Sequence, residues 1–390
     1  MVQRFIPYGC QSINQDDVEA VSRALTGEII TRGFLVEEFE RTVAEYCGAE
    51  YAVAFNSATS ALEAALVAAE VNANDRLLTT PNTFVGSITG AEKRGATTVF
   101  IDIDEQSGNL HMEQLEANLN FRATRGKEII LPVHYAGVPV DMASLDSLIA
   151  NSRTIVIEDA AHALGSVYPT GEKVGSCKWS HMTVFSFHPA KTITTGEGGM
   201  VTTNHEEIYH RLKRFRNNGI ERNPQYLEHR LTPWYYEVQE ISGNYNFTDF
   251  QAALGLSQFK RLEKFIAKRQ RLSACYRQLL RGALHITPLK PAPEHNAAYH
   301  LFVVKIDFEK CGISREKLML DLKEQGIGTQ VHYIPVYKHP YFVKKNGELS
   351  EYFPAMERYY SQALSLPLHC EMNEDDVEEI CSILKKMVKN

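Results

Sequence analysis

Lys191 is a residue that could do covalent chemistry. It lies in the stretch VFSFHPAKTITTGEGGM (184–200), between an aromatic-rich apolar run and a cluster of threonines and glycines. A lysine becomes a nucleophile only in its neutral form, which burial or nearby positive charge makes accessible. A turn rich in Thr and Gly also lets a ligand approach the main chain. Taken alone, the position fits a solvated surface lysine better, so its interpretation depends on the residues that accompany it.

Asp159 and His162 lie upstream, in the stretch VIEDAAHALGS (156–166). The aspartate ends a strand-like run, and at the carboxyl edge of a parallel sheet such side chains face the crevice where α/β proteins bind ligands. A carboxylate there can keep a proton on the nitrogen of a heterocycle. An aspartate before a helix can also be a simple N-cap, and the sequence leaves both readings open.

Two further stretches add a phosphate site and an aromatic face. AFNSATSALEAAL (54–66) passes from strand to helix through small polar residues, and the free N–H groups of a helix start bind phosphate. TTPNTFVGS (79–87) places Phe84 at the end of the next strand, where it could stack on a flat ring. An ordinary capped helix and a core phenylalanine are the alternatives. No nucleotide P-loop or dinucleotide glycine fingerprint is present.

The order of these features along the chain carries more information than each alone. A phosphate cradle, a stacking aromatic residue, a carboxylate for a ring nitrogen and a lysine are the parts needed to hold pyridoxal 5′-phosphate (PLP). The sequence therefore predicts a PLP site at one edge of a parallel sheet.

The elements that must position these residues alternate between short strands and helices, which predicts an α/β fold with a large, mostly parallel, seven-stranded sheet. A long helix is predicted over 248–268, and after Leu284 a proline-rich stretch leads to a smaller α/β unit. We therefore divide the chain into a PLP-binding large domain, with an N-terminal arm, over 1–270 and a small C-terminal domain over 271–390. The predicted strands are residues 51–55, 76–80, 97–103, 128–135, 154–159, 182–187 and 199–204.

Composition excludes several other classes of protein. The 390 residues carry a net charge of −7, without the basic excess that binding to nucleic acid requires. No signal peptide or apolar run of membrane-spanning length is found, so we expect a cytoplasmic protein that does not bind membranes. The seven cysteines are scattered and never spaced as CxxC, which predicts free thiols and no bound metal.

A series of segments along nearly the whole chain resembles the DegT/DnrJ/EryC1 group of sugar aminotransferases, which are fold-type I PLP enzymes. Within that group, FNSATSAL, AHALGS and VFSFHPAKTITTGEGG are most similar to the transaminases of pseudaminic acid biosynthesis. The other matching segments are GEIITRGFLVEEFE (27–40), TTPNTFVGS (79–87), PVHYAG (132–137), GNYNFTDFQAALGLSQ (243–258) and VHYIPVYKHPYF (331–342).

The resemblance implies a role for each candidate residue. Lys191 would carry the cofactor covalently and move protons, and Asp159 would keep the pyridine nitrogen protonated. His162 would lie beside the 3′-oxygen, where many relatives have Gln, and Phe84 would stack on the ring. The residues implied for the phosphate are Ala58, Thr59 and Ser186.

The family pattern also implies a shared active site in a homodimer. An asparagine of the neighbouring subunit completes the phosphate site, and GNYNFTD (243–249) offers both Asn244 and Asn246. Asn244 matches the common pattern, whereas Asn246 stands where Arg is frequent. For the sugar nucleotide the resemblance suggests Thr31, His332 and Tyr333, although His332 could equally be a packed histidine. His188 could support Lys191 or be structural.

The implied reaction is transamination of the C4 ketone of a UDP-4-keto-6-deoxy-N-acetylhexosamine, with L-glutamate as amino donor. A bacillosamine-type UDP-sugar or a dTDP- or GDP-4-keto-6-deoxyhexose remains an alternative substrate. Lys191 argues against the dehydratases of this fold group, which have His there. A PLP-binding regulator without turnover would need a DNA-binding region, and none is recognised in the sequence.

Overall fold

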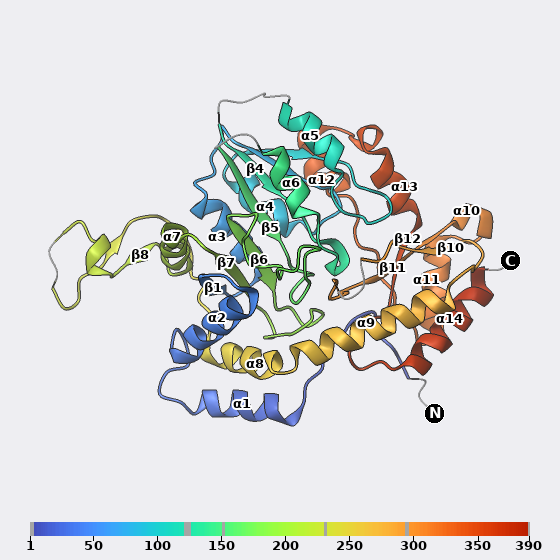
Figure 1. Cartoon of the computed structure of the whole chain (residues 1–390), viewed down its shortest axis with the longest axis horizontal. Helices are drawn as coiled ribbons and strands as arrows, with labels where there is room; N and C mark the ends of the chain where they lie inside the picture. The colour runs from blue at the N-terminus through green and yellow to red at the C-terminus, as the bar shows by residue number, and fades with distance from the viewer. Residues whose placement is uncertain (1–3, 121–125, 150–152, 230–231, 293–295, 389–390) are drawn as a thin grey trace.

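A seven-stranded sheet forms the centre of the molecule, as the computed structural model shows for residues 4–120, 126–149, 153–229, 232–292 and 296–388 (Figure 1). The strand order is β1-β7-β6-β5-β4-β2-β3, and among the described strands of this sheet β7 runs antiparallel to the other six. The predicted α/β class and mostly parallel sheet are thus confirmed. The strands are β1 (Tyr51–Phe55), β2 (Arg76–Thr79), β3 (Thr97–Phe100), β4 (Glu128–Leu131), β5 (Thr154–Asp159), β6 (Met182–Ser186) and β7 (Gly199–Thr203).

Alternate side chains of these strands enter two separate cores, one on each face of the sheet. Val53 and Phe55 face one core, whereas Ala52 and Ala54 face the other. The first core is covered by α3 (Ala58–Ala68), α4 (Gly86–Lys93) and α7 (Glu206–Arg216). The second is covered by α2 (Phe34–Cys47), α5 (Met112–Asn120), α6 (Met142–Leu148) and α8 (Asp249–Phe259). Helix α1 (Gln15–Leu25) packs on α8.

The helix predicted over 248–268 is wrong in its extent. The structure has two helices, α8 and the longer α9 (Leu262–Leu279), separated at Lys260 and Arg261 (Figure 1). Near the break, Gln258 and Arg261 both donate hydrogen bonds to the carboxylate of Asp17 and to the carbonyl of Ser12. These bonds to the N-terminal segment hold the break, and helical periodicity alone does not reveal them.

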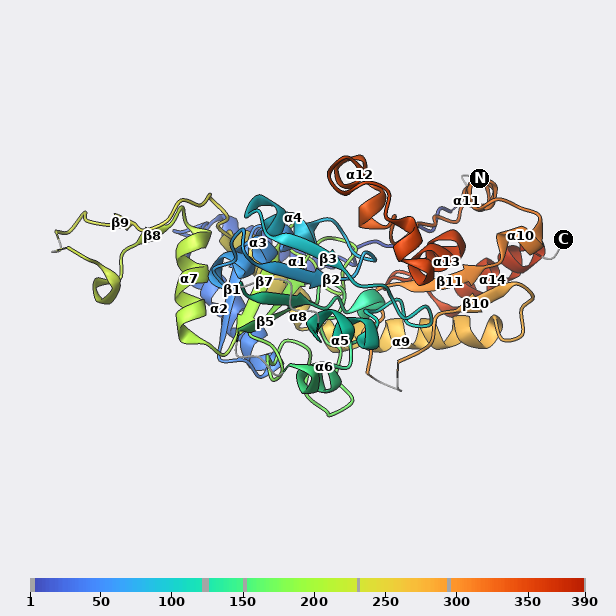
Figure 2. The same cartoon turned by 90° about the horizontal axis from the view of Figure 1, so that it is seen from above.

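The last third of the chain packs around a three-stranded antiparallel sheet of β10 (Ile286–Pro288), β11 (Phe302–Ile306) and β12 (Ala363–Leu366). Figure 2 shows it at one end of the molecule. Ile6 joins its core and forms a bridge with Ile327. The division that we propose at residue 270 falls inside α9. The helices here are α10 (Phe308–Cys311), α11 (Arg315–Glu324), α12 (Pro340–Asn346), α13 (Pro354–Gln362) and α14 (Glu374–Val388).

A narrow arm extends from the opposite end of the molecule and contains β8 (Ile220–Glu221) and β9 (Glu237–Val238) (Figures 1 and 2). Single 3₁₀ turns occur at Tyr135–Gly137, Pro224–Tyr226, Val336–Lys338 and Ser350–Tyr352. Within the described ranges, none of the helices combines the length and the apolar character needed to cross a bilayer. All seven cysteines are free thiols.

Candidate active site

A cavity of about 660 Å³ opens at the carboxyl ends of the parallel strands. Its walls come from the segments that follow β1, β2, β5 and β6, together with residues of the C-terminal third. The cavity brings together most of the site residues predicted from the sequence. They are Ala58, Thr59, Phe84, Asp159, His162, Ser186, Lys191, His332 and Tyr333, and His188 lies beside them.

The start of α3 forms one wall of the cavity. Ser57 caps the helix in a reciprocal box with Ser60, so Ala58 and Thr59 occupy the first two helical positions. Their N–H groups have no partner within the helix and carry the positive end of its dipole. Gly199 packs against this turn so tightly that a Cβ atom would lie 2.5 Å from the carbonyl oxygen of Ser57. The tight packing fixes an anion-binding wall.

Ser186 adds a hydroxyl to the same wall. It ends β6 and pairs directly with Gly199, so its side chain lies next to the start of α3. The main-chain N–H of His188 donates a long bond of 3.4 Å to its Oγ. Backbone donors together with a hydroxyl make this corner suitable for a phosphate group.

Asp159 lies at the end of β5, with its carboxylate at the floor of the cavity. Ser87 donates to Oδ2 at 2.6 Å, and the N–H of Ala161 donates to Oδ1 at 3.1 Å. Ser87 is itself 2.6 Å from the hydroxyl of Thr83. The carboxylate is therefore held in one orientation while it faces the cavity.

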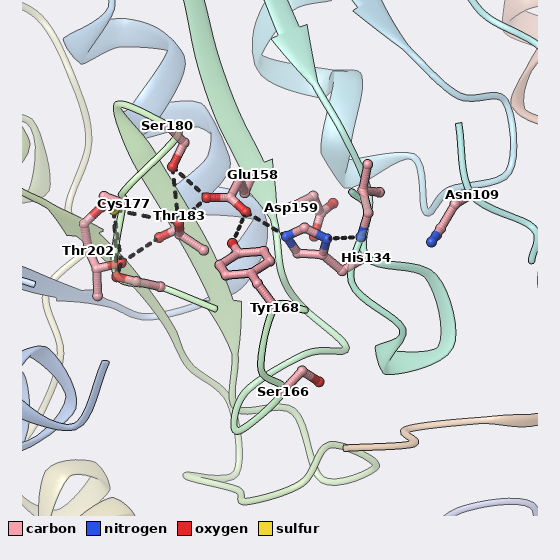
Figure 3. A network of polar contacts seen from close by, with 12 residues as sticks. Asn109, His134, Glu158, Asp159, Ser166, Tyr168, Cys177, Ser180, Thr183 and Thr202 are labelled. Carbon is pink, nitrogen blue, oxygen red and sulfur yellow. Dashed lines mark hydrogen bonds and ion pairs between the residues drawn. The ribbon is translucent and has the colours of Figure 1, made fainter. Parts of the chain in front are cut away.

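Glu158, the preceding residue, is the centre of a buried polar network (Figure 3). Its carboxylate accepts hydrogen bonds from His134 at 2.7 Å and Thr183 at 2.9 Å, and also from Ser180 and Tyr168. Burial alone would raise the pKa of Glu158, but these bonds outweigh it and hold the pKa below its usual value. The network ties together the segments around Asp159.

Lys191 is half-buried, with its side chain in the cavity, and this changes its acidity. Burial lowers the pKa of its ammonium group to about 8; Asp159 opposes the shift and Arg269 adds to it. The neutral amine is therefore far more accessible near pH 7 than that of a surface lysine. The same guanidinium group donates to the main-chain oxygen of Lys191 at 3.4 Å.

His162 and Tyr333 form a hydrogen-bonded pair whose direction the structure fixes. Nδ1 of His162 accepts from the N–H of Ala136 at 3.3 Å, so Nε2 carries the hydrogen and donates to the Tyr333 hydroxyl at 3.0 Å. Burial, and then the charges of Lys191 and His332, put the pKa of His162 well below its usual value. The hydrogen of the Tyr333 hydroxyl is thus free to be donated into the cavity.

Phe84 is exposed to solvent, whereas His332 is buried. The ring of Phe84 is 58% exposed, an unusual position for a large apolar side chain that lines a cavity. His332 is buried, and its Nδ1 lies 2.8 Å from the hydroxyl of Ser365. Burial also lowers the pKa of His332 to about 3. His332 is thus both a packed histidine and a cavity residue.

Three predicted residues do not line this cavity in the single chain. Thr31 is exposed and forms a bridge with Thr248 near the start of α2. Asn244 is exposed, and its Oδ1 accepts from the side-chain amide of Asn246 at 2.7 Å. Both asparagines follow the arm in the sequence, and their contribution to a neighbouring subunit stays a prediction.

Several cavity residues were not predicted from the sequence: Tyr8, Ser87, Glu197 and His300. Ser87 follows Phe84 in a stretch already singled out, and its hydroxyl at the start of a helix was an available signal. His300 comes from a segment after the proline-rich stretch, where no local pattern points to the cavity.

Comparison with known proteins agrees with this geometry. Residues 11–385 match the DegT/DnrJ/EryC1/StrS aminotransferase family. The UDP-4-amino-4,6-dideoxy-N-acetyl-beta-L-altrosamine transaminase of Campylobacter jejuni is 36% identical over 388 residues, covering 98% of this chain and 99% of the relative.

Two solved structures have the same fold over nearly their whole length. Helicobacter pylori PseC, an aminotransferase involved in the biosynthesis of pseudoaminic acid, has a TM-score of 0.89 at 29% identity and covers 99% of this chain and 100% of its own. The PLP form of Spr1654, a putative sugar aminotransferase from Streptococcus pneumoniae, has a TM-score of 0.87 at 26% identity, with 99% of each chain covered. This chain belongs to the DegT/DnrJ/EryC1/StrS aminotransferase family.

Proposed function

We propose that this chain is a cytoplasmic, homodimeric, PLP-dependent enzyme that transaminates the C4 ketone of a UDP-4-keto-6-deoxy-N-acetylhexosamine, with L-glutamate as amino donor. The observation that carries the proposal is the meeting of Lys191, Asp159 and the start of α3 in one cavity. The similarity to the Campylobacter jejuni transaminase and to Helicobacter pylori PseC supports the choice of a pseudaminic-acid-type sugar.

The residues of the cavity fit PLP group by group. The first turn of α3, with Ala58 and Thr59, would hold the phosphate through its free N–H groups. Gly199 packs so closely against this turn that no Cβ would fit there, which keeps the turn in place. Asp159 would keep the ring nitrogen protonated, and the exposed ring of Phe84 would cover one face. When bound, PLP supplies an electron sink for the charge that develops at the α-carbon of the amino donor.

Lys191 would do the proton transfers. Its pKa of about 8 leaves a useful fraction of neutral amine near pH 7, and that amine takes the proton from the α-carbon of the donor. In the second half of the reaction it returns a proton to C4 of the sugar. His188 lines the same cavity as Lys191, and we assign it no specific role in the reaction.

Tyr333 would donate a hydrogen bond to an oxygen in the cavity. His162 donates to its hydroxyl oxygen, which leaves the hydroxyl hydrogen free for either the 3′-oxygen of PLP or the sugar. Burial raises the pKa of Tyr333 far above 10, so it stays a neutral donor across the working pH range. We assign His332, which also lines the cavity, to the part that would hold the sugar.

The site would be completed by a second subunit. Asn244, or its hydrogen-bonded neighbour Asn246, would reach the phosphate of the partner subunit, and Thr31 would contact the sugar nucleotide. Each chain would then depend on its neighbour for turnover.

The proposed function is tested by assaying the purified protein with glutamate against UDP-, dTDP- and GDP-4-keto-6-deoxy sugars, with mass detection of the products. We expect glutamate-dependent amination of the UDP-N-acetyl sugar, with much less product from the others. Borohydride reduction and peptide mapping are expected to find the pyridoxyl label on Lys191. A label elsewhere, or amination only of a dTDP- or GDP-sugar, would contradict the corresponding part of the proposal.

A further inference from the structure

His300 lies within hydrogen-bond distance of the Lys191 amine. Its Nε2 lies 3.4 Å from Nζ, and no other described side chain or main-chain group forms a hydrogen bond with that nitrogen. The imidazole is buried and lines the same cavity. The contact spans 109 positions of the sequence, so it is made by the fold and not by chain proximity.

Three segments converge to hold His300 in this place. Its N–H donates to the carbonyl of Ala136 at 2.9 Å, and the adjacent Gly137 has a φ of +88°. A Cβ on Gly137 would lie 2.8 Å from the carbonyl oxygen of His162 and 3.0 Å from the nitrogen of His300. Tyr299, just before the histidine, has a φ of 45°, which costs free energy in a residue with a side chain.

Arg269 ties the two residues together through their main chains. Its Nη2 donates to the carbonyl of Lys191 at 3.4 Å and its Nη1 to that of His300 at 3.3 Å. The Nη1 atom also donates to the carbonyl of Leu368 at 2.8 Å. The buried Arg269 guanidinium therefore fixes the main chains of Lys191 and His300 relative to each other, and with them the distance between the amine and the imidazole.

The protonation of the imidazole follows from the charges around it. Lys191, His162, Arg269 and His332 all face His300, and burial together with these groups puts its pKa well below the usual value. A neutral imidazole beside an ammonium group must accept, so Nε2 is unprotonated and Nδ1 carries the hydrogen. Nδ1 is buried and has no partner among the described residues. An unpaired buried N–H group costs free energy, and a histidine with a purely structural role would gain nothing in return.

We infer that His300 is a positioning residue that accepts a hydrogen bond from the free amine of Lys191 and so fixes the direction in which that amine exchanges protons. The inference rests on the proposed function, since it concerns the lysine to which that function assigns proton transfer. It adds a residue that the sequence did not single out.

The matched variants are His300→Gln, which keeps an acceptor near the position of Nε2, and His300→Met, which has a similar shape without one. The measurement is the pH dependence of acetic anhydride labelling of Lys191 in the cofactor-free protein, followed by peptide mass mapping. Because a neutral acceptor stabilises the ammonium form, we expect His300→Met to lower the midpoint by about one pH unit. His300→Gln should stay close to the wild-type midpoint near 8.

The control is His205→Met, which changes an exposed histidine outside the cavity and should leave the midpoint unchanged. An unaltered midpoint in a folded His300→Met protein would overturn the inference. Should neither variant fold, nitrogen NMR of histidine-labelled wild-type protein gives the answer. We expect a neutral His300 with hydrogen on Nδ1 at pH 7, and an imidazolium or an Nε2–H form refutes the assignment.

These measurements use the protein without PLP, so they are independent of turnover. Failure of the borohydride map at Lys191 would remove the proposed function. A normal map with an unshifted labelling midpoint would remove only the role of His300.

Discussion

The hydroxyl of Ser87 lies 2.6 Å from Oδ2 of Asp159 and donates a hydrogen bond to it. This bond comes from the first turn of α4, so a helix that packs on the sheet also orients the carboxylate that faces the cavity. The chemistry assigned to Asp159 therefore depends on a second residue, and the two contributions can be separated by mutation.

Asp159→Asn is expected to slow the half-reaction with glutamate by roughly 10²- to 10³-fold, the effect of one preorganised electrostatic contact. Ser87→Ala should slow it by about tenfold, because the carboxylate remains but loses a donor. Single-turnover absorbance changes on adding glutamate give both rates. Thr89→Val removes a hydroxyl from the outer side of the same helix and should change nothing. Equal losses in Ser87→Ala and Thr89→Val would argue against the role of the bond.

Lys191→Ala is expected to abolish the half-reaction with glutamate and the covalent labelling of the protein by borohydride. Binding of PLP should persist at reduced affinity, because the first turn of α3 and Ser186 remain in place. Equilibrium dialysis measures the binding and peptide mapping the label. Turnover by this variant at the wild-type rate cannot be reconciled with the assigned role.

Gly199→Ala is expected to weaken the binding of PLP by tenfold or more. The added Cβ would lie 2.5 Å from the carbonyl oxygen of Ser57 and 2.6 Å from the Ala58 nitrogen, so the first turn of α3 must shift. Gly9→Ala is the control, since its Cβ would meet Ala190 at an ordinary 3.5 Å. Fluorescence titration of the cofactor-free proteins compares the two. Similar dissociation constants would mean that α3 does not hold the phosphate.

Glu158→Gln is expected to lower the free energy of unfolding at pH 7 by about 2 kcal/mol, because a buried carboxylate loses its charge-assisted hydrogen bonds. The pKa of Glu158 is lower in the folded than in the unfolded chain, where it is about 4.5. Its contribution is thus complete above about pH 4.5 and is lost as the pH falls through the lower, folded-state pKa.

Urea unfolding of wild type and Glu158→Gln between pH 3 and pH 7 checks this dependence. The difference between the two proteins should be constant near neutrality and shrink in acid. Glu116→Gln, on the exposed side of α5, should match the wild type throughout. A difference that grows as the pH falls would mean that Glu158 is held in its protonated form.

The sheet and most of the cavity could be predicted because their signals are local. Each strand is a short apolar run, and in an α/β sheet the ends of such runs meet at one edge, which is why Asp159 and Lys191 could be placed together. The helix boundary near Lys260 could not be predicted, because it depends on contacts with Asp17, far away in the sequence.

His300 was missed for the same reason. It follows an irregular segment, and its place beside Lys191 is set by Gly137 and Arg269, so no periodicity or motif near it carries the information. The predictions for Asn244 and Asn246 concern a neighbouring subunit and the prediction for Thr31 concerns the sugar nucleotide, so a single chain does not test them. Tertiary contacts and assembly thus account for what the sequence did not reveal.

Among the described residues, the buried guanidinium of Arg269 donates to four main-chain oxygens, those of Lys191, Tyr299, His300 and Leu368, and also interacts with the side chain of Cys370. Carbonyl groups are the same whichever amino acid carries them. The side chains at neighbouring positions of the cavity wall can therefore be replaced by mutation, which can change the preference for one sugar over another. The hydrogen bond from Arg269 to the main chain of Lys191 is kept in each case. In such a scaffold specificity can drift during evolution without a new catalytic centre having to be built.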